Sequence, residues 1–184
     1  MDSTPERPVW TTSSLARSTW SDSHIFGKPH ATEYDSSATS DTTVGNTDGV
    51  TIYYEHETGV NQIKAGTSTA IAASIESGDF DISAAQGGGA DLRGAGDYMM
   101  KIRRVLPDFL QQTGDARVTL NLKNYPTDSQ ASSSLGPFTT TTSTDKIDTR
   151  ARARAISLKV DNTSTGQHWK LGTFRLDIQA DGRR

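Results

Sequence analysis

The chain has 184 residues, of which 33% are hydrophobic and 22% are charged, and it contains no cysteine. This length suits one domain, or one domain with a long arm. The low apolar share indicates either that part of the chain is irregular or that neighbouring subunits add stability. The missing cysteines exclude disulfides and thiolate metal sites, and no apolar run is long enough to span a membrane.

Charge is distributed unevenly along the sequence. Residues 1–90 carry 4 basic and 12 acidic side chains, a net charge of −8, whereas residues 91–184 carry 15 basic and 10 acidic side chains, a net charge of +5. Such a dipolar subunit suits head-to-tail packing, in which an acidic region meets a basic one. The alternative is that both regions are simply solvated.

Residues 1–49 are rich in Ser, Thr, Asp, Gly and Pro and show no helical or strand period. Isolated apolar anchors interrupt this composition, among them Trp10 and Trp20. Disordered tails seldom carry two tryptophans. The sequence therefore predicts an extended, irregular N-terminal arm that is pinned to a surface by its aromatic side chains.

A series of strands is predicted from residue 50 onward. Turn residues and alternation of apolar and polar side chains mark each one. The predicted strands are 50–57, 70–75, 80–82, 98–106, 117–125, 138–143 (an exposed edge), 150–160 and 169–178, with a glycine-rich loop at Gly87 to Gly96. Without a convincing long helix, these short strands predict an all-β domain at 50–184, a β-sandwich or jelly roll.

Two of these strands have unusual patterns. In 150–160 the even positions begin with Arg150, Arg152 and Arg154 and end with apolar residues, so one face starts basic and ends over a core. In 169–178 the apolar parity changes near Gly172, which predicts a β-bulge there.

No catalytic constellation stands out. On a strand, His56 would point away from Glu55 and Glu57, so a surface or structural role is favoured over metal binding. Asp79 and Asp81 share one predicted strand face at roughly 7 Å, as a glycosidase pair can. Pairing with Arg152 or Arg154 is the simpler explanation. We therefore expect no enzyme activity and no cofactor.

The arginines at 150, 152 and 154 invite two interpretations. They are candidates for phosphate contacts, but the chain is acidic overall (sequence pI about 5.8) and no aromatic residue lies between them. Salt bridges within or between subunits are favoured. Together with Trp10 and Trp20, these arginines are the predicted interface residues.

A set of short motifs, in fixed order, resembles a recurring bacteriophage pattern. The motifs are Trp20–Asp22, Gly49–Gly59, Ile75–Ile82, Arg104–Phe109, Val118–Leu120 with Tyr125 and Pro126, Thr149–Arg154, Trp169–Asp177 and Asp181–Arg184. Their order is similar to the C-terminal part of tail nozzle (hub, or tail tubular B-like) proteins of short-tailed phages. Members of that family are usually longer, with a propeller-like part ahead, and have a shorter loop where Gly87 to Gly96 lie here.

The resemblance implies a structural virion protein of the phage tail. Such proteins form rings of copies, commonly six-fold, around a channel that DNA crosses, and contact other tail or head-to-tail proteins. Assembly in the host cytoplasm is implied as well. An alternative function is a tail-tip module that binds carbohydrate or a receptor in a groove with Tyr53 or Tyr54; a tail glycosidase using Asp79 and Asp81 is a third.

Overall fold

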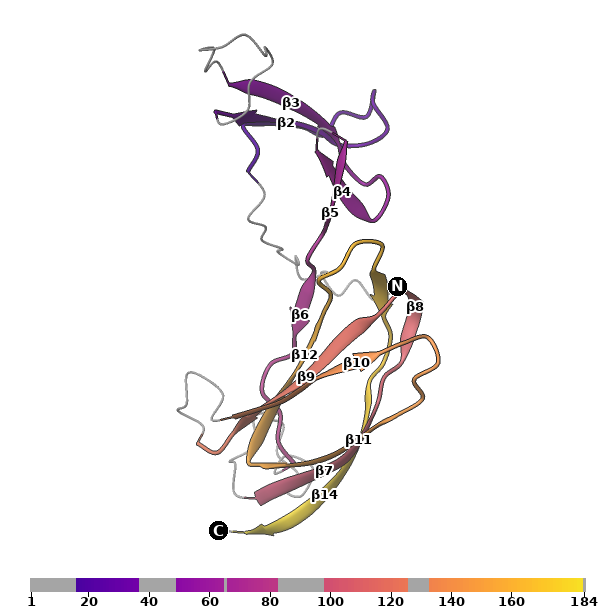
Figure 1. Cartoon of the computed structure of the whole chain (residues 1–184). Helices are drawn as coiled ribbons and strands as arrows, with labels where there is room; N and C mark the ends of the chain where they lie inside the picture. The colour runs from indigo at the N-terminus through magenta and orange to yellow at the C-terminus, as the bar shows by residue number, and fades with distance from the viewer. Residues whose placement is uncertain (1–15, 37–48, 65, 83–97, 126–132, 184) are drawn as a thin grey trace, which may run out of the picture. The chain divides into compact units, whose positions relative to one another are not determined.

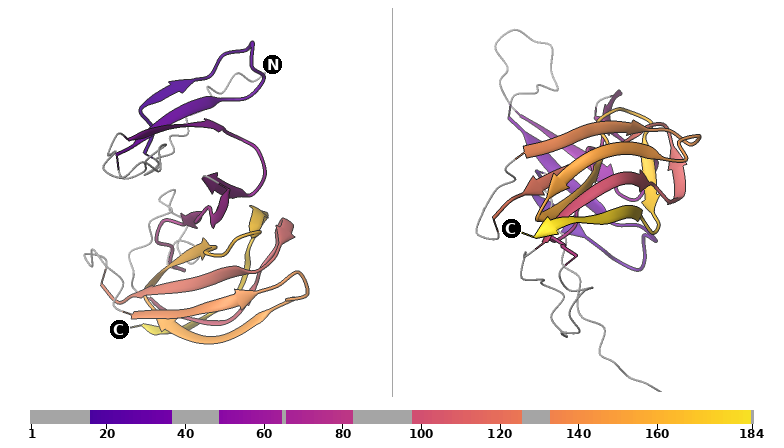
Figure 2. Two further views of the ribbon diagram at one scale, coloured as in Figure 1. Left: turned by 45° about the horizontal axis from the view of Figure 1, so that its top comes forward. Right: turned by 90° about the horizontal axis from the view of Figure 1, so that it is seen from below.

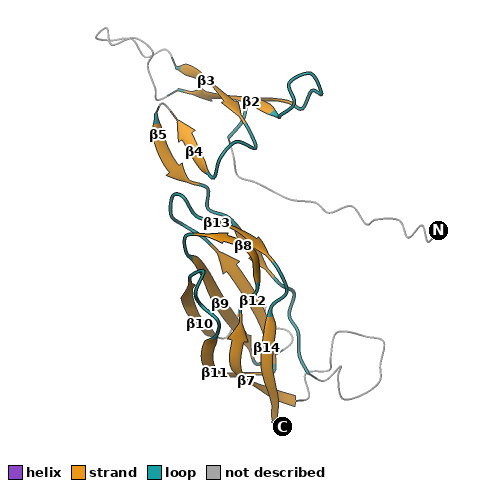
Figure 3. Cartoon of the chain, turned by 90° about the vertical axis from the view of Figure 1, so that its right-hand side faces the viewer, coloured by secondary structure: helices purple, strands orange, loops and turns teal. Residues whose placement is uncertain are grey.

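The computed structural model of the protein describes residues 16–36, 49–64, 66–82, 98–125 and 133–183. Within these residues every helix or strand assigned is a strand (Figures 1 and 3). The same ranges contain no helix long and apolar enough to cross a membrane. The predicted all-β class is therefore confirmed, and the chain divides into two compact units, Met1–Gly59 and Val60–Arg184.

The first unit contains a three-stranded antiparallel sheet in the order β1-β2-β3. Its strands are β1 (Thr19–Ser21), β2 (His30–Asp35) and β3 (Val50–Glu55). The sequence analysis assigned residues 19–35 to an irregular arm and began the next domain at residue 50. The structure instead pairs β2 with β3 along their whole length, from His30 opposite Glu55 to Asp35 opposite Val50, so the boundary lies after Gly59.

The second unit begins with the hairpin of β4 and β5 and continues into three further sheets. The strand orders are β10-β9-β12-β6, β11-β7-β14 and β13-β8. The strands are β4 (Asn61–Lys64), β5 (Thr67–Ala70), β6 (Ser74–Glu76), β7 (Tyr98–Leu106), β8 (Phe109–Thr113), β9 (Ala116–Lys123), β10 (Ser133–Thr140), β11 (Ile147–Ala153), β12 (Ala155–Asp161), β13 (His168–Leu171) and β14 (Arg175–Arg183).

A single apolar core joins the four-stranded and three-stranded sheets of this unit, as a β-sandwich requires. Alternation along each strand places one set of side chains inside. The fully buried members with the largest volume are Met100, Ile102, Val105, Val118, Leu120, Ile156 and Val160. Burial of each large apolar side chain contributes about 1.5–3 kcal/mol. Figure 2 shows these strands from two further directions.

The predicted strand 150–160 is in fact two strands in two different sheets. β11 ends at Ala153 and β12 begins at Ala155, with Arg154 between them. Ala151 and Ala153 are buried from the three-stranded sheet, and Ile156 is buried from the four-stranded one. The buried side chains therefore change from odd-numbered to even-numbered positions where the chain passes from one sheet to the other.

The second change of parity has the same cause. β13 ends at Leu171 and β14 begins at Arg175, again in different sheets, so the predicted bulge at Gly172 is a corner between strands. The Gly172 N–H donates to the Asp108 carbonyl oxygen at 2.9 Å, and a Cβ at position 172 would lie 2.5 Å from that oxygen. Only glycine permits this close approach of two backbones.

The remaining strand predictions are confirmed to differing degrees. β7 has the predicted bounds, and the predicted edge strand at 138–143 corresponds to β10, which ends at Thr140 and lies at the edge of its sheet. The predicted strand 70–75 is divided between the end of β5 and the start of β6. The loop at Gly87 to Gly96 lies outside the described residues.

Candidate interaction surfaces

The residues considered for metal binding or hydrolysis have the following surroundings. Among the described residues, no three His, Asp or Glu side chains are placed to hold a metal ion. Asp79 and Asp81 flank Phe80, which makes an isolated bridge to Ile156. Asp79 forms an ion pair with Lys123 at 2.7 Å, and Arg152, one of the two predicted partners, pairs with Asp181 instead.

One open cleft of about 560 Å³ lies beside the end of β7. Its polar lining includes Asp108, Asp145 and Arg175 together with Thr141 and Thr144.

A basic surface covers the outer face of the β11-β7-β14 sheet. Lys101, Arg103 and Arg104 on β7 are exposed, as are Arg150 and Arg152 on β11. We call these five residues the basic face. The register places Arg152 directly opposite Lys101, and the bulge between Asp148 and Ala151 places Arg150 beside Arg103. Like charges directly opposite each other are destabilising in an antiparallel pair.

Part of the basic face is neutralised within the chain. Arg104 pairs with Asp148 at 3.1 Å, and Arg152 pairs with Asp181 on β14. The guanidinium of Arg104 and the ammonium of Lys146 lower the pKa of the Asp148 carboxyl. Lys101, Arg103 and Arg150 have no ion pair with any residue that the structure describes.

The predicted arginine trio is thus only partly one surface. Arg150 and Arg152 lie on β11, whereas Arg154 lies in the connection to β12, where its backbone N–H donates to the Lys123 carbonyl oxygen. The sequence analysis missed Lys101 and Arg103. Their alternation with the buried Met100 and Ile102 within β7 is the pattern that places them on the outer face.

The outer face of the four-stranded sheet is also polar, but its side chains bind one another. Glu76 accepts from Ser157 Oγ at 2.6 Å and from Asn121 Nδ2 at 2.7 Å, and Ser134 Oγ donates to Asn121 Oδ1 at 2.8 Å. We call Glu76, Asn121, Ser134 and Ser157 the polar network. Its hydrogen bonds from Ser157 and Asn121 lower the pKa of the Glu76 carboxyl.

In the first unit, one face of the β1-β2-β3 sheet is covered by its own side chains. Arg17 pairs with Glu33 at 2.9 Å, lies 3.9 Å from the centre of the Tyr54 ring and donates to His56 Nε2 at 3.3 Å. Trp20 lies 4.5 Å from the His56 ring. Burial, followed by the charge of Arg17, lowers the pKa of His56.

Trp20, predicted as an interface residue, therefore contributes to this local cluster, although 56% of its surface remains exposed. Trp10, its predicted companion, lies outside the described residues. Of the two tyrosines considered for a groove, Tyr54 is only 8% exposed, whereas Tyr53 is 63% exposed on the opposite face of the sheet. Strand alternation separates the two.

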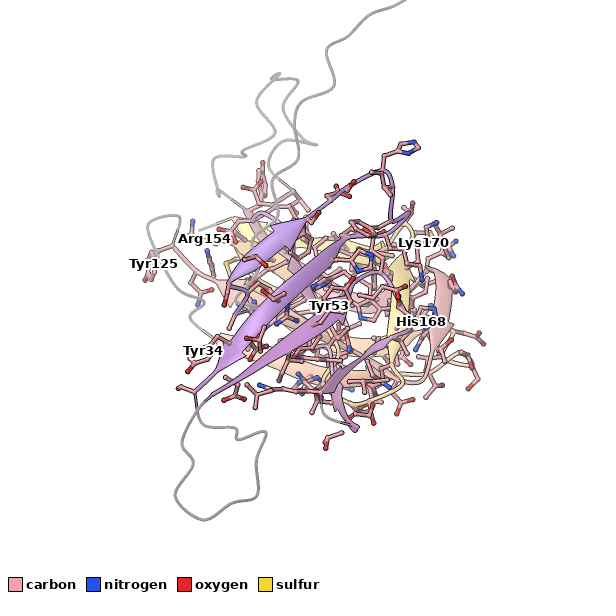
Figure 4. All side chains as sticks on the ribbon, turned by 90° about the horizontal axis from the view of Figure 1, so that it is seen from above. Tyr34, Tyr53, Tyr125, Arg154, His168 and Lys170 are labelled. Carbon is pink, nitrogen blue, oxygen red and sulfur yellow. The ribbon has the colours of Figure 1, made fainter. Side chains whose placement is uncertain are left out.

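The opposite face of this sheet carries an exposed line of rings, which we call the aromatic row: Phe26, His30, Tyr53 and Tyr34. The His30 ring stacks on Tyr53 with centroids 5.2 Å apart and meets the edge of Phe26 at 4.9 Å. The Tyr53 hydroxyl is hydrogen-bonded to His30 Nδ1. Tyr34 and Tyr53 lie on the two adjacent strands shown in Figure 4.

The structure thus defines an all-β protein whose second unit is a β-sandwich, with a basic face, a polar network and a separate aromatic row. Comparison with known proteins adds no family: no family model matches the chain, and no curated protein is detectably similar to it.

Proposed function

We propose that this chain is a non-enzymatic structural subunit of a bacteriophage tail, which assembles with copies of itself into a ring around the channel for DNA. The observation that carries the self-assembly is the basic face, where Lys101, Arg103 and Arg150 have no ion-pair partner among the described residues. The order of sequence motifs supports placing that assembly in a tail nozzle or hub.

The register makes the basic face an unfavourable arrangement for an isolated chain. Lys101 and Arg152 are directly opposite each other, which is destabilising for like charges even though Arg152 also pairs with Asp181. A partner that supplies carboxylates would remove this cost and add charge-assisted hydrogen bonds, for which the planar guanidinium is well suited.

The chain itself carries the complementary charge. Met1–Gly59 has 3 basic and 9 acidic side chains, a net charge of −6, and Val60–Arg184 has 16 basic and 13 acidic side chains, a net charge of +3. The acidic unit of one copy is therefore a suitable partner for the basic face of the next. Repetition of such a head-to-tail contact closes into a ring when the rotation between copies allows it.

Charge alone does not supply the stability of a ring, because exposed ion pairs contribute only about 0–1 kcal/mol each. In this proposal the charges fix the register, and apolar and backbone contacts hold the copies together. A six-fold ring, contacts with other tail proteins and a place in the virion follow from the family resemblance and belong to the same proposal.

The experiment compares two charge reversals in the full chain. Arg150→Glu alters the basic face, and Lys170→Glu makes a reversal of similar size at another exposed strand position of the same unit, on β13. We expect native mass spectrometry at low salt to show oligomers for the wild type and for Lys170→Glu, and a shift to monomers for Arg150→Glu. Equal behaviour of the two variants would show that the basic face is not the interface.

A further inference from the structure

We propose that the aromatic row on the first unit is a binding site for an uncharged oligosaccharide. This inference does not rest on the ring, because it concerns aromatic side chains and not the charges that pair copies in the proposed ring. Tyr53 and Tyr34 are 63% and 59% exposed, so their rings are accessible although they belong to strands of a three-stranded sheet.

The sheet itself sets the spacing of the row. Thr32 lies opposite Tyr53, and Tyr34 lies opposite Thr51, so the two tyrosines are diagonal neighbours on one face. Side chains in that relation start about 7–8 Å apart at their backbones, and the two rings lean in opposite directions, Tyr53 towards His30 and Tyr34 over Gly49. An oligosaccharide that lies along this face can therefore contact Tyr53 and Tyr34 with different sugar rings, through their C–H faces.

Two of the rings are held in place by contacts within the unit. Tyr53 is stacked on His30 and hydrogen-bonded to its Nδ1. The ring of Tyr34 lies over Gly49, where an added Cβ would come within 2.5 Å of Tyr34 Cζ. Rings that are already fixed lose little side-chain entropy when a ligand stacks on them.

The surroundings of the row favour a sugar over an apolar protein surface. The strand positions on this face carry hydroxyl or charged groups and no aliphatic side chain: Thr19, Ser21, Thr32, Thr51 and Glu55. Such groups hydrogen-bond to sugar hydroxyls while the rings contact the apolar faces, which is the combination that orients a polar ligand in a site.

Charge excludes the two other common ligands of stacked aromatic rings. The unit that bears the row has a net charge of −6, and the lysine beside this face, Lys28, is paired with Glu55 at 3.1 Å. Single-stranded nucleic acids and acidic polysaccharides need a positive groove beside the stacking rings. The ligand that fits both rings and charge is therefore an uncharged glycan.

The test uses the full-length chain on a printed array of neutral and acidic glycans, followed by calorimetry with the neutral glycan that gives the strongest signal. We expect binding by neutral glycans, weakened about tenfold or more by Tyr53→Ala and by Tyr34→Ala. Tyr53→Phe, which keeps the ring, should retain most of the affinity. Tyr125→Ala, at a tyrosine that is 66% exposed in the second unit, is the control that should bind like the wild type.

Several results would overturn the proposal. One is a wild-type chain that is folded, as judged by its NMR spectrum, and binds no neutral glycan. A second is glycan binding that stays unchanged in Tyr53→Ala and Tyr34→Ala. A third is a preference for acidic over neutral glycans. Loss of oligomers on Tyr53→Ala or Tyr34→Ala, without glycan binding by the wild type, would instead assign the row to a protein contact. Oligomers lost in Arg150→Glu with glycan binding retained would separate this site from the ring interface.

Discussion

The two outer faces of the sandwich differ in how completely their polar groups are satisfied. On the four-stranded sheet, Glu76 joins Ser157 and Asn121 by bonds of 2.6 and 2.7 Å. On the three-stranded sheet, Lys101 faces Arg152 across the strands, and Arg103 and Arg150 have no ion pair with the described residues. The side chains of the first face stabilise the fold by binding one another, whereas the second face places like charges opposite each other.

The largest effect on the free energy of unfolding should come from a buried polar residue just after β12. Asn162 is 3% exposed; its Oδ1 accepts from Trp169 Nε1 at 3.1 Å, and its Nδ2 donates to the Ile71 carbonyl at 3.0 Å. Asn162→Ala leaves both groups unpaired, so we expect the free energy of unfolding in urea to fall by about 1–3 kcal/mol. Asn162→Asp keeps an acceptor for Trp169 but places a buried carboxylate oxygen against the Ile71 carbonyl oxygen, so it should lose at least as much stability at pH 7, and a clearly smaller loss would contradict this account.

The second-largest expected effect is the pH dependence of the stability that the polar network contributes through Glu76. Hydrogen bonds from Ser157 and Asn121 hold the pKa of Glu76 below its unfolded value near 4.5, so its ionised form stabilises the fold above that pH. This stability is lost as the pH falls through the folded pKa. The wild type should therefore exceed Glu76→Gln in urea stability at pH 7, and the two should converge on acidification below about pH 4.5.

The matched control for this titration lies on the basic face. The pKa of Asp148 is also lowered, by Arg104 and then by Lys146, but its side chain is 62% exposed and water screens both pairs. As the pH falls, the difference in urea stability between the wild type and Asp148→Asn should therefore shrink by less than the difference between the wild type and Glu76→Gln. A larger one would mean that exposed ion pairs, rather than the polar network, determine acid stability.

The strands that could be predicted from the sequence are those with a clear local pattern of residue types. β7 was predicted with its observed bounds because its residues are mostly apolar and Pro107 stops the strand, and the apolar residues of β9 were placed on one face because they alternate with polar ones. In contrast, β2 has no such alternation. Its strand depends on pairing with β3, which no local pattern reports.

Which side chains meet at the candidate sites was harder to predict than the strands, because it depends on the register between strands. Asp79 was expected to meet Arg152 or Arg154, but β9 brings Lys123 to it, and Asp181 at the end of the chain takes Arg152. The changes of parity near Arg154 and Gly172 were visible in the sequence. Their cause, passage of the chain between sheets, requires knowing which strands are neighbours.

The smallest expected change in the free energy of unfolding comes from replacing one lysine with glutamate on each outer face of the sandwich. Its sign should differ between the two faces, so it compares them most directly. Lys101→Glu places a carboxylate opposite Arg152 in place of an ammonium, so a like-charged pair becomes an opposite-charged one. We expect a gain of a few tenths of a kcal/mol in unfolding free energy at low salt. Salt should diminish that gain, because the pair is exposed.

Lys159→Glu makes the same change on the four-stranded sheet, where Lys159 Nζ lies 3.9 Å from Asp161 Oδ2. Here the new carboxylate meets an existing one, so stability should fall by a similar small amount. If Lys101→Glu also lowered the stability of the monomer, the basic face would be serving the fold of the single chain. If it raises stability while removing oligomers, the same charge is unfavourable within one copy and favourable between two, which is the behaviour that distinguishes an assembly surface from a structural one.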